Sequence, residues 1–500
     1  MLSSFRLILQ ILRSLWRIGL LSLRPSVPLA FLRAWWRCGS SYACLAQFAA
    51  SRFPRHAAVV DEQGSLTFLE LHRRSEELAA DLFERYALHP GHRVGLLSRN
   101  HRDMVVALIA LTRLGVDVLL LSTESPGPAL QRILAGQSPQ LIVHDAELAE
   151  SLAGCSSPCH VIENVLAERH VRLPRTGRVG RILLLTSGST GLAKSIARRP
   201  TLRSVLPVLA GLLQALPLRM HAPAISAIPL YHGYGLAVMA MALTFGAPLY
   251  LARRCDVGPL LDRLPQGAPP AVLISVPTLL ERWLSTTPAL IPPLAAVITG
   301  SAPLSPKLCR RLLDCVGPRL FNLYGSTEAG IISLATPEVL QDAPGTVGRP
   351  LLGNRVRIAP GTNEIQVQGP LALSAPVGKW YGTGDVGRMD KQGRLFVCGR
   401  LDAMVISGGE NVYPYETESA LLEHPDLADA AVIAVADPDF GQALLAWVVP
   451  RPGITVDAKT LREWLRQRLD RFKLPREIKV ATSIPRNALG KVDQRALGER

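Results

Sequence analysis

The sequence predicts an α/β protein built from layers of sheet and helix, followed by a small α+β unit near its C-terminal end. Short apolar runs alternate with helical patterns over most of the chain, a rhythm typical of sheets covered by helices. The 500 residues, 48% hydrophobic and 19% charged, are also enough to bury a large core. The composition therefore indicates a globular protein.

The individual elements follow in order along the chain. Apolar runs predict strands at residues 57–60, 94–97, 141–143, 182–185, 225–230, 272–275 and 295–298. Helical patterns lie between the first of them, at residues 69–86 and 103–114. The C-terminal unit is expected to contain a helix, two strands and a helix, at residues 414–422, 430–436, 443–449 and 461–469.

An amphipathic helix is expected at residues 1–24, within an N-terminal segment of residues 1–50. Spacings of seven, four and seven residues place four arginines on one narrow stripe, and these are Arg6, Arg13, Arg17 and Arg24. Apolar side chains fill the rest of the circumference, but no run reaches the ~20 apolar residues that span a bilayer. The pattern favours a helix that lies in the membrane interface, with its arginines at anionic headgroups. Packing against the protein itself or a partner subunit is the alternative.

A second basic and apolar stretch follows at residues 31–37, which include Trp35 and Trp36. It would continue the membrane contact or form part of a hydrophobic entrance. Together these segments predict a cytoplasmic protein that is peripheral on the inner face of the cell membrane. The eight scattered cysteines form neither a disulfide framework nor a zinc pattern, which agrees with the cytosol.

The net charge of +15 is concentrated at the N-terminal end. Residues 1–60 contain eight arginines and no acidic residue, which leaves about +7 on the other 440 residues. No basic run is interleaved with aromatic residues in the way that nucleic-acid-binding segments are. Nucleic acid is therefore not an expected partner.

A loop of hydroxyls and glycines follows the apolar run at residues 182–185. Its members are Thr186, Ser187, Gly188, Ser189, Thr190 and Gly191, with Lys194 three residues further on. Glycines let backbone N–H groups approach an anion, hydroxyls donate hydrogen bonds, and a lysine supplies positive charge. Because the spacing differs from the Walker loop, the pattern indicates another kind of phosphate-binding loop. An ordinary surface loop is the alternative.

Three later turn-rich stretches carry further polar groups. Residues 322–328 offer an aromatic ring, a hydroxyl and a carboxylate, which suit a base, a phosphate and a divalent cation. Asp385, at the end of residues 381–385, could accept hydrogen bonds from both hydroxyls of a ribose. Residues 399–412 predict a strand and hairpin that begin a new domain, and Lys491 lies in a turn near the C-terminus.

In this order and spacing, the motifs resemble the AMP-forming adenylating superfamily, which includes acyl-CoA synthetases, the adenylation domains of peptide synthetases, and luciferases. The resemblance covers residues 50–497. Within the superfamily, the chain looks most like bacterial medium- and long-chain fatty acyl-CoA ligases. The run at residues 407–412 and the Pro-Arg-Asn at residues 485–487 are typical of that branch.

The resemblance implies a large N-terminal catalytic domain, residues 51–400, and a small mobile C-terminal domain, residues 401–500, hinged near Asp402. It also implies the reaction. The carboxylate of a medium- or long-chain fatty acid would attack the α-phosphorus of ATP, giving an acyl-adenylate and pyrophosphate. The thiolate of CoA would then attack the acyl carbon and release AMP. The implied cofactors are ATP, Mg²⁺ and CoA.

The resemblance further implies a role for each matching residue. The loop at residues 186–194 would enclose the β- and γ-phosphates. Adenine would lie against Tyr324 and Gly325 and the backbone of Gly300, Ser301 and Ala302. Thr327 would contact the α-phosphate, and Glu328 would bind Mg²⁺. Asp385 and Arg400 would hold the ribose.

Other implied roles concern the two half-reactions. Lys491 would bridge the carboxylate and the α-phosphate and stabilise the charge that develops as pyrophosphate leaves. His232 would gate the acyl pocket between the half-reactions. Gly408 and Gly409 would let the pantetheine of CoA pass close to the backbone.

The chain departs from the family pattern at two places. The usual Pro-Lys-Gly after the loop is Ala193-Lys194-Ser195 here, and Ala403 replaces an Asp that is common in the family. The first change puts turnover in doubt rather than the type of reaction. Two other functions remain open: an acyl-AMP ligase that loads an acyl carrier protein, and a degenerate, non-catalytic binder of nucleotide or lipid.

Overall fold

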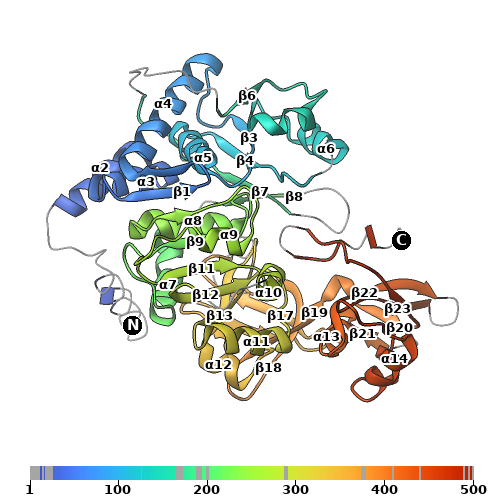
Figure 1. Ribbon diagram of the computed structural model, residues 1–500. Coiled ribbons are helices and arrows are strands. Elements are labelled where there is room, and N and C mark those ends of the chain that lie inside the picture. The colour runs from blue at the N-terminus through green and yellow to red at the C-terminus, as the bar shows by residue number, and fades with distance from the viewer. Residues whose placement is uncertain are drawn as a thin grey trace. The chain divides into compact units, whose positions relative to one another are not determined.

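The computed structural model describes most of the chain, namely residues 9, 12, 13, 16, 26–125, 127–163, 173–186, 194–198, 202–286, 291–372, 379–407, 410–437, 441–487, 490–493 and 496–497. The chain divides into two compact units (Figure 1). The first comprises Met1–Ser275 with Ser285–Val297, and the second comprises Val276–Leu284 with Ile298–Arg500. The domain boundaries expected after residues 50 and 400 stay predictions.

The first unit contains a six-stranded sheet in the order β6-β5-β3-β4-β7-β8. These strands are β3 (Arg93–Leu97), β4 (Asp117–Leu120), β5 (Leu141–His144), β6 (Cys159–Val161), β7 (Ile182–Thr186) and β8 (Lys194–Arg198). All neighbours are parallel except β7 and β8, which are antiparallel. Parallel strands need crossover connections, and helices α5 (Arg102–Leu114) and α6 (Gly127–Gln137) provide two of them. The predicted βαβ rhythm is confirmed in this sheet.

Five other strands of the first unit follow the order β11-β9-β10-β1-β2. They are β1 (Ala57–Asp61), β2 (Gly64–Thr67), β9 (Ala224–Ser226), β10 (Leu249–Tyr250) and β11 (Ala271–Ser275). Four helices belong to this part: α4 (Phe68–Tyr86), α7 (Leu202–Ala215), α8 (Gly233–Phe245) and α9 (Val257–Leu261). The strand predicted at residues 225–230 ends already at Ser226, because Pro229 has no N–H to pair and its carbonyl accepts the His232 N–H in a turn.

Helices α2 (Ser26–Cys38) and α3 (Tyr42–Arg52) pack against each other in the first unit (Figure 1). The Ser41 side chain caps α3 by accepting the N–H of Cys44. Most of α3 is buried against α4, α5 and α8, and the Tyr42 hydroxyl donates to the Leu236 carbonyl of α8 at 3.3 Å. α3 thus joins the N-terminal helices to α8.

The amphipathic helix expected at residues 1–24 falls largely outside the described residues. Residues 9, 12, 13 and 16 are described, and all four are helical. No described helix is long and apolar enough to cross a membrane.

The second unit begins its β-structure with antiparallel strands β13 (Leu320–Ser326), β14 (Gly330–Ala335) and β15 (Arg349–Pro350). The chain enters this unit through β12 (Leu294–Gly300), and its helices here are α10 (Pro277–Thr286), α11 (Pro306–Val316) and α12 (Pro337–Asp342). A four-stranded antiparallel sheet follows in sequence order: β16 (Arg355–Ile358), β17 (Glu364–Gln368), β18 (Tyr381–Met389) and β19 (Leu395–Arg400).

The C-terminal part of the second unit is the small α+β structure that the sequence predicted. Its sheet has the order β21-β20-β23-β22, with β24 paired to β23. The strands are β20 (Val405–Ser407), β21 (Glu410–Val412), β22 (Leu427–Asp437), β23 (Gly441–Pro450) and β24 (Glu477–Val480). Helices α13 (Pro414–Leu422) and α14 (Ala458–Arg466) pack on it through the fully buried Leu421, Leu461 and Leu465. Each such leucine contributes about 1.5–3 kcal/mol of hydrophobic stabilisation.

Candidate functional site

The turns after β12 and β13 bring backbone unusually close to backbone. A Cβ at Gly300 would lie 2.5 Å from the Leu323 carbonyl oxygen, and one at Gly325 would lie 2.3 Å from that of Gly330. Only glycine is therefore accommodated at these two positions. Ser301 has a φ of 65°, in the left-handed region that a serine rarely adopts, and such strain gathers at functional sites.

Asp385 lies at the centre of a cluster of polar side chains. The Tyr324 hydroxyl donates to its Oδ2 at 2.6 Å, and Nη1 of Arg400 lies 3.2 Å from its Oδ1. The Thr383 hydroxyl accepts the Asp385 N–H at 3.1 Å and donates to the Ile365 carbonyl at 2.9 Å. The antiparallel register of β18 and β19 places Asp385 directly opposite Arg400. The sheet itself therefore creates the ion pair.

Arg400 also binds Asp402, so one guanidinium joins two carboxylates. Its Nε and Nη2 lie 3.1 and 3.2 Å from the two oxygens of Asp402. These hydrogen bonds lower the pKa of Asp402 and raise that of Arg400. Burial, followed by the adjacent Asp385, raises the pKa of Tyr324. The phenol accordingly stays neutral and the guanidinium charged over the physiological range.

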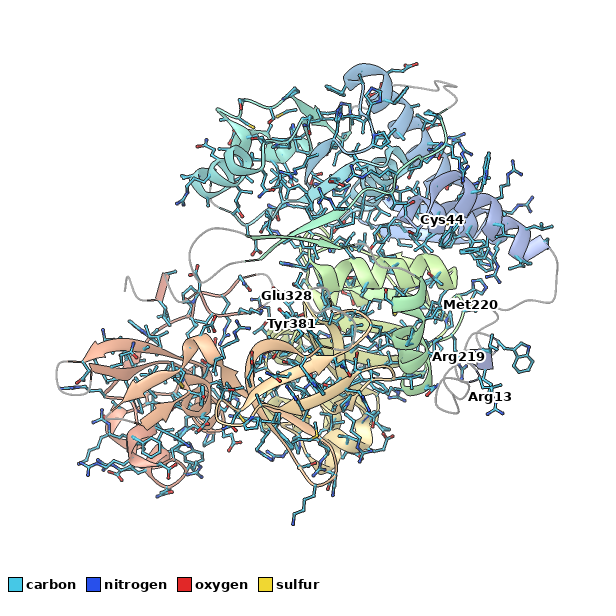
Figure 2. The ribbon with its side chains drawn as sticks, turned by 180° about the vertical axis from the view of Figure 1, so that it is seen from behind. Arg13, Cys44, Arg219, Met220, Glu328 and Tyr381 are labelled. Carbon is cyan, nitrogen blue, oxygen red and sulfur yellow. The ribbon has the colours of Figure 1, made fainter. Side chains whose placement is uncertain are left out.

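Thr327 and Glu328 lie, half-buried, in the tight turn after β13. The Ser326 hydroxyl accepts the Ala329 N–H at 3.0 Å and closes this turn. Glu328 lies close to Tyr381 (Figure 2), and its charge adds to burial in raising the pKa of the Tyr381 phenol. In the part of the chain that the structure describes, no group of three or more His, Cys, Asp or Glu residues could hold a metal ion. A single carboxylate is nevertheless enough for Mg²⁺ that is bound mainly by substrate phosphates and water.

Lys491 is held in a turn that several hydrogen bonds fix. Its N–H donates to the Asn487 Oδ1 at 3.0 Å, and its carbonyl accepts the Asn487 N–H at 2.9 Å. Nη1 of Arg486 donates to the Gly490 carbonyl at 2.9 Å, while its Nη2 lies 2.6 Å from Oδ1 of Asp429. Arg486 thus anchors the lysine turn to β22.

The ammonium of Lys491 interacts electrostatically with the Asp385 cluster. Surrounding protein lowers its pKa by desolvation, although the residue as a whole is exposed. The carboxylates of Asp385 and Glu328 oppose this shift, and Arg400 adds to it. All four charges belong to the second unit. The Lys491 ammonium is therefore linked electrostatically to Asp385, Arg400 and Glu328.

The other predicted residues lie in the first unit or outside the described residues. Thr186 and Lys194 pair with each other across the β7–β8 hairpin, so the predicted loop connects these two strands. Seven predicted residues lie outside the described part, and they are Ser187, Gly188, Ser189, Thr190, Gly191, Gly408 and Gly409. His232 is the N-cap residue of α8, with its ring 4.5 Å from that of Tyr231. Burial raises the pKa of Tyr231 to about 12.

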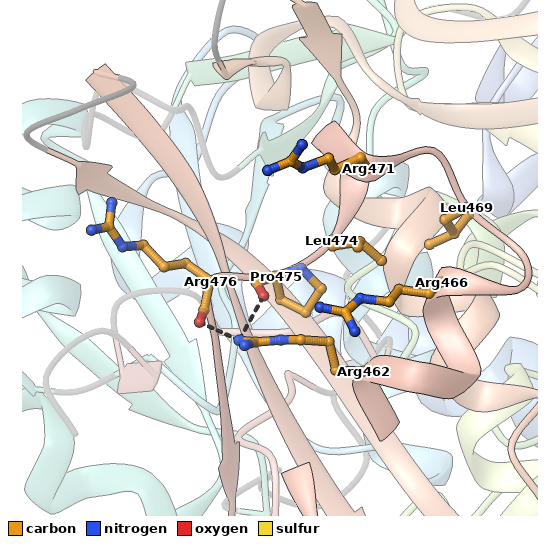
Figure 3. A pocket seen from close by; sticks show the side chains of 7 residues that line it. All are labelled: Arg462, Arg466, Leu469, Arg471, Leu474, Pro475 and Arg476. Atoms are coloured by element: carbon orange, nitrogen blue, oxygen red, sulfur yellow. Dashed lines mark hydrogen bonds between the residues drawn. The ribbon is translucent and has the colours of Figure 1, made fainter. Parts of the chain in front are cut away.

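A pocket of about 550 Å³ in the C-terminal part is lined mainly by arginines (Figure 3). We call it the arginine pocket, and its lining is Arg462, Arg466, Leu469, Arg471, Leu474, Pro475 and Arg476. Nη2 of Arg462 donates to the Pro475 carbonyl at 3.2 Å. Arg466 is paired with Glu463 and Arg476 with Asp437, which leaves the lining positively charged. Guanidinium groups in such numbers suit a phosphate-bearing ligand.

Sequence reasoning missed three of these features. Thr383 and Arg486 were noted only within longer motifs, because their roles depend on contacts with distant strands. The arginine pocket had one available signal, the four-residue spacing of Arg462 and Arg466, which places them on one face of a helix.

Comparison with known proteins assigns the chain to a family. The family model of the AMP-binding enzyme matches residues 46–374, and that of the AMP-binding enzyme C-terminal domain matches residues 416–491. The chain therefore belongs to the AMP-binding enzyme family. It is 30% identical to the 2-succinylbenzoate–CoA ligase of Bacillus velezensis, over 89% of this chain and 95% of that protein. It is 31% identical to the feruloyl-CoA synthase of an Amycolatopsis species (88% and 95% covered) and to the indoleacetate–CoA ligase of Aromatoleum aromaticum (88% and 94%).

Solved structures agree with this assignment. The o-succinylbenzoate CoA synthetase of Bacillus subtilis, in complex with ATP and a magnesium ion, matches with a TM-score of 0.79 and 25% identity, over 91% of this chain and 99% of that one. The amide bond synthetase of Marinactinospora thermotolerans gives the same four values. The predicted superfamily is confirmed, as is the fold class with its large N-terminal and small C-terminal domain. ATP, Mg²⁺ and CoA are the cofactors of this family. The chain is an AMP-forming acid–CoA ligase whose named relatives act on aromatic acids.

Proposed function

We propose that the acid is an aromatic carboxylic acid, which the chain adenylates and then transfers to CoA. The main support is that the named relatives act on succinylbenzoate, ferulate and indoleacetate, and that they match almost their full length to this chain. The three acids share a carboxylate on a ring-bearing body. Phenylalkanoates and cinnamate-like acids are the corresponding substrate class.

The Asp385 cluster is proposed to hold the ribose and base of ATP. Each carboxylate oxygen has two lone pairs. Tyr324 and Arg400 use one oxygen each, which leaves room for two ribose hydroxyls to donate to Asp385. The ring of Tyr324 would stack on adenine next to the turn at residues 300–302. Thr327 would contact the α-phosphate.

Glu328 is proposed as the protein ligand of Mg²⁺, which neutralises phosphate charge when bound. The ammonium of Lys491 would lie between the acid carboxylate and the α-phosphate, two anions that repel each other. It would stabilise the charge that builds up as the carboxylate attacks. Its electrostatic coupling to Asp385 and Glu328 supports this placement.

The arginine pocket is proposed to receive a phosphate group of CoA. CoA carries a 3′-phosphate and a pyrophosphate, and planar guanidinium groups bind such oxygens through two parallel hydrogen bonds. Arg466 and Arg471 are the two arginines of this pocket that we expect to contribute most. An acyl carrier protein is the other acceptor to be tested.

A medium- or long-chain fatty acid is the second candidate substrate. It is favoured by the exposed apolar side chains of α2, which suit a protein that meets lipids, and by the motifs at residues 407–412 and 485–487. The aromatic class ranks first because it is the class named among the relatives.

A panel of acids tests these assignments. The purified chain is incubated with ATP, MgCl₂ and either CoA or an acyl carrier protein, and with 2-succinylbenzoate, ferulate, indoleacetate, octanoate or palmitate; acyl thioester and AMP are quantified by chromatography. We expect the highest kcat/KM with an aromatic acid and CoA. A clear preference for the fatty acids would overturn the aromatic assignment, and the absence of any acyl-CoA would overturn the ligase.

Two matched lysine variants distinguish a specific role of Lys491 from a general effect of losing a lysine. Lys491→Ala should abolish acid-dependent pyrophosphate release, whereas Lys391→Ala, in the exposed turn between β18 and β19, should leave it unchanged. Equal release by both variants would mean that Lys491 has been given the wrong role.

A further inference from the structure

The outer face of α2 is exposed and strongly apolar. Leu29, Leu32 and Trp36 follow one another at spacings of three and four residues, so they share one helix face. Their exposed fractions are 64%, 59% and 62%. Ala34 and Cys38, on the other side, are fully buried. We call the three exposed residues the α2 face.

The described residues before α2 repeat this pattern. Leu9, Leu12 and Trp16 have the same spacing of three and four, and they too are exposed, Trp16 by 71%. Arg13 lies exposed among them (Figure 2). Two successive helical stretches therefore present large apolar side chains to solvent, whereas single exposed leucines would be ordinary on a protein surface.

Arginines border the α2 face. Arg33 is exposed on α2 itself, and Arg175 stacks its guanidinium on the Trp36 ring, 4.4 Å from the centroid. Nε of Arg175 also donates to the Trp36 carbonyl, which holds a second positive charge at this face. Arg37 is turned inward, 2.5 Å from Glu76. No acidic residue occurs in the first 60 residues.

This combination specifies the chemistry of the partner. Exposed leucines and tryptophans bordered by arginines suit a surface with an apolar interior and anionic headgroups, in which tryptophan prefers the boundary. A protein partner would need to supply both a large apolar patch and acidic groups around it. Such a pattern suits a helix that lies in the interface of a lipid surface.

We propose that the α2 face, together with the exposed Leu9, Leu12 and Trp16, docks the enzyme on an anionic lipid surface. Contacts within the first unit connect α2 to α8. α2 packs on α3, and Tyr42 of α3 bonds to Leu236 of α8, the helix that begins next to His232. This surface would place α8 near the membrane, where apolar acids partition. The docking itself does not depend on which acid is the substrate.

Vesicle co-sedimentation tests the proposal on the 500-residue chain. We expect binding to vesicles of phosphatidylglycerol and phosphatidylcholine, weaker binding at high salt, and little binding to phosphatidylcholine alone. The double variant Leu29→Glu with Leu32→Glu should lower the affinity for the mixed vesicles at least about tenfold, because it moves two charges into the lipid boundary. The matched control is Leu69→Glu, at an exposed leucine of α4 in the same unit, which should bind like the unaltered chain.

Three results would overturn the proposal: no binding of the unaltered chain to anionic vesicles, equal binding by the double variant, or equal loss with Leu69→Glu. Light scattering after size-exclusion chromatography tests the alternative that a second copy of the chain binds the α2 face. A dimer that the double variant converts to monomers, without vesicle binding, would assign the α2 face to self-association. Ligase activity on a water-soluble acid, measured without vesicles, shows that each variant is folded and is unaffected by a failure of docking.

Discussion

At the scale of single residues, the proposed nucleotide site depends on the hydrogen bonds of Asp385. Tyr324 and Arg400 bind its carboxylate, and the Thr383 hydroxyl accepts its backbone N–H. These partners come from β13, β18 and β19, so no short stretch of sequence contains the arrangement. The individual residues were predicted from motifs, but their hydrogen bonds follow from strand register, which the sequence does not display.

Asp385→Asn should weaken ATP binding more than any other step. The amide keeps the size of the side chain but replaces one acceptor oxygen by a donor, which faces either the Tyr324 hydroxyl or Arg400. Hydrogen bonds to a charged group are worth about 1.5–3 kcal/mol, so we expect KM for ATP to rise about 10- to 150-fold. Pyrophosphate release at varied ATP measures this.

Tyr324→Phe is the matched variant for Asp385→Asn. It keeps the ring that would stack on adenine and removes only the hydroxyl, which binds Asp385 rather than the nucleotide. We therefore expect KM for ATP to rise less than with Asp385→Asn, by about fivefold or less. An equal effect of the two variants would contradict the central position of the carboxylate.

The charge of Lys491 should set an upper pH limit for adenylation. The ammonium form is fully present below the pKa of Lys491 and is lost as pH rises through it. Because desolvation lowers this pKa from its ordinary value of 10.5, activity should fall at a lower pH than for an ordinary lysine. Single-turnover adenylation between neutral and alkaline pH measures the limit.

Lys491→Arg tests the cause of that limit, since a guanidinium stays charged throughout this range. We expect lower activity at all pH values, without the fall in activity at the alkaline pH where the unaltered chain loses it. A decline that the substitution does not move would have to come from another group.

At the scale of elements, the arginine pocket combines residues from a helix with residues from the segment after it. α14 contributes Arg462 and Arg466, and the segment that follows contributes the other arginines of the pocket. The sequence predicted a helix at residues 461–469, and the structure places it at Ala458–Arg466. The pocket could not be predicted, because its other lining residues follow the helix. A helical pattern does not determine the conformation of the segment after the helix.

Reversing charge in the arginine pocket should affect CoA and spare ATP. Arg466→Glu combined with Arg471→Glu should raise KM for CoA about tenfold or more, since each lost charge-assisted phosphate contact costs about 1.5–3 kcal/mol. KM for ATP should change less than about twofold, because distant sites with no shared contacts are nearly independent. Initial rates at varied CoA and varied ATP measure the two effects.

Arg355→Glu, on the exposed strand β16, is the control for this charge reversal. If it raised KM for CoA as much, the effect would be due to the overall charge of the protein rather than to the pocket.

At the scale of the whole molecule, the sequence predicted the fold class and the order of the motifs, while the boundaries of some elements differ. The βαβ pattern gave β3, β5 and β7 within a residue or two. The strand expected at residues 225–230 was too long, because apolar residues continue past Ser226 although Pro229 prevents further pairing. The acid substrate was not predictable from ordinary apolar side chains, and the fatty-acid expectation rested on two short motifs.

Removing residues 1–25 should leave catalysis on a water-soluble acid intact. The family match begins at residue 46, and α2 and α3 remain. We expect kcat/KM within about twofold of the 500-residue chain, because the removed residues precede the family match. Removing residues 1–52 should instead destabilise the first unit, since it takes away the buried helix α3. Thermal unfolding and acyl-CoA formation compare the two truncations, and equal damage by both would show that the first 25 residues belong to the fold.

The shared contacts of Asp385 have a thermodynamic consequence for nucleotide binding. Tyr324, Asp385, Arg400 and Asp402 hold one another in place through the protein's own contacts, so their rotamer entropy would be lost when the protein folds rather than when ATP binds at the proposed site. The loss of side-chain entropy on nucleotide binding should then be small, because these side chains are ordered beforehand. In calorimetry, Asp385→Asn would accordingly make the entropy of ATP binding more unfavourable as well as weaken its enthalpy.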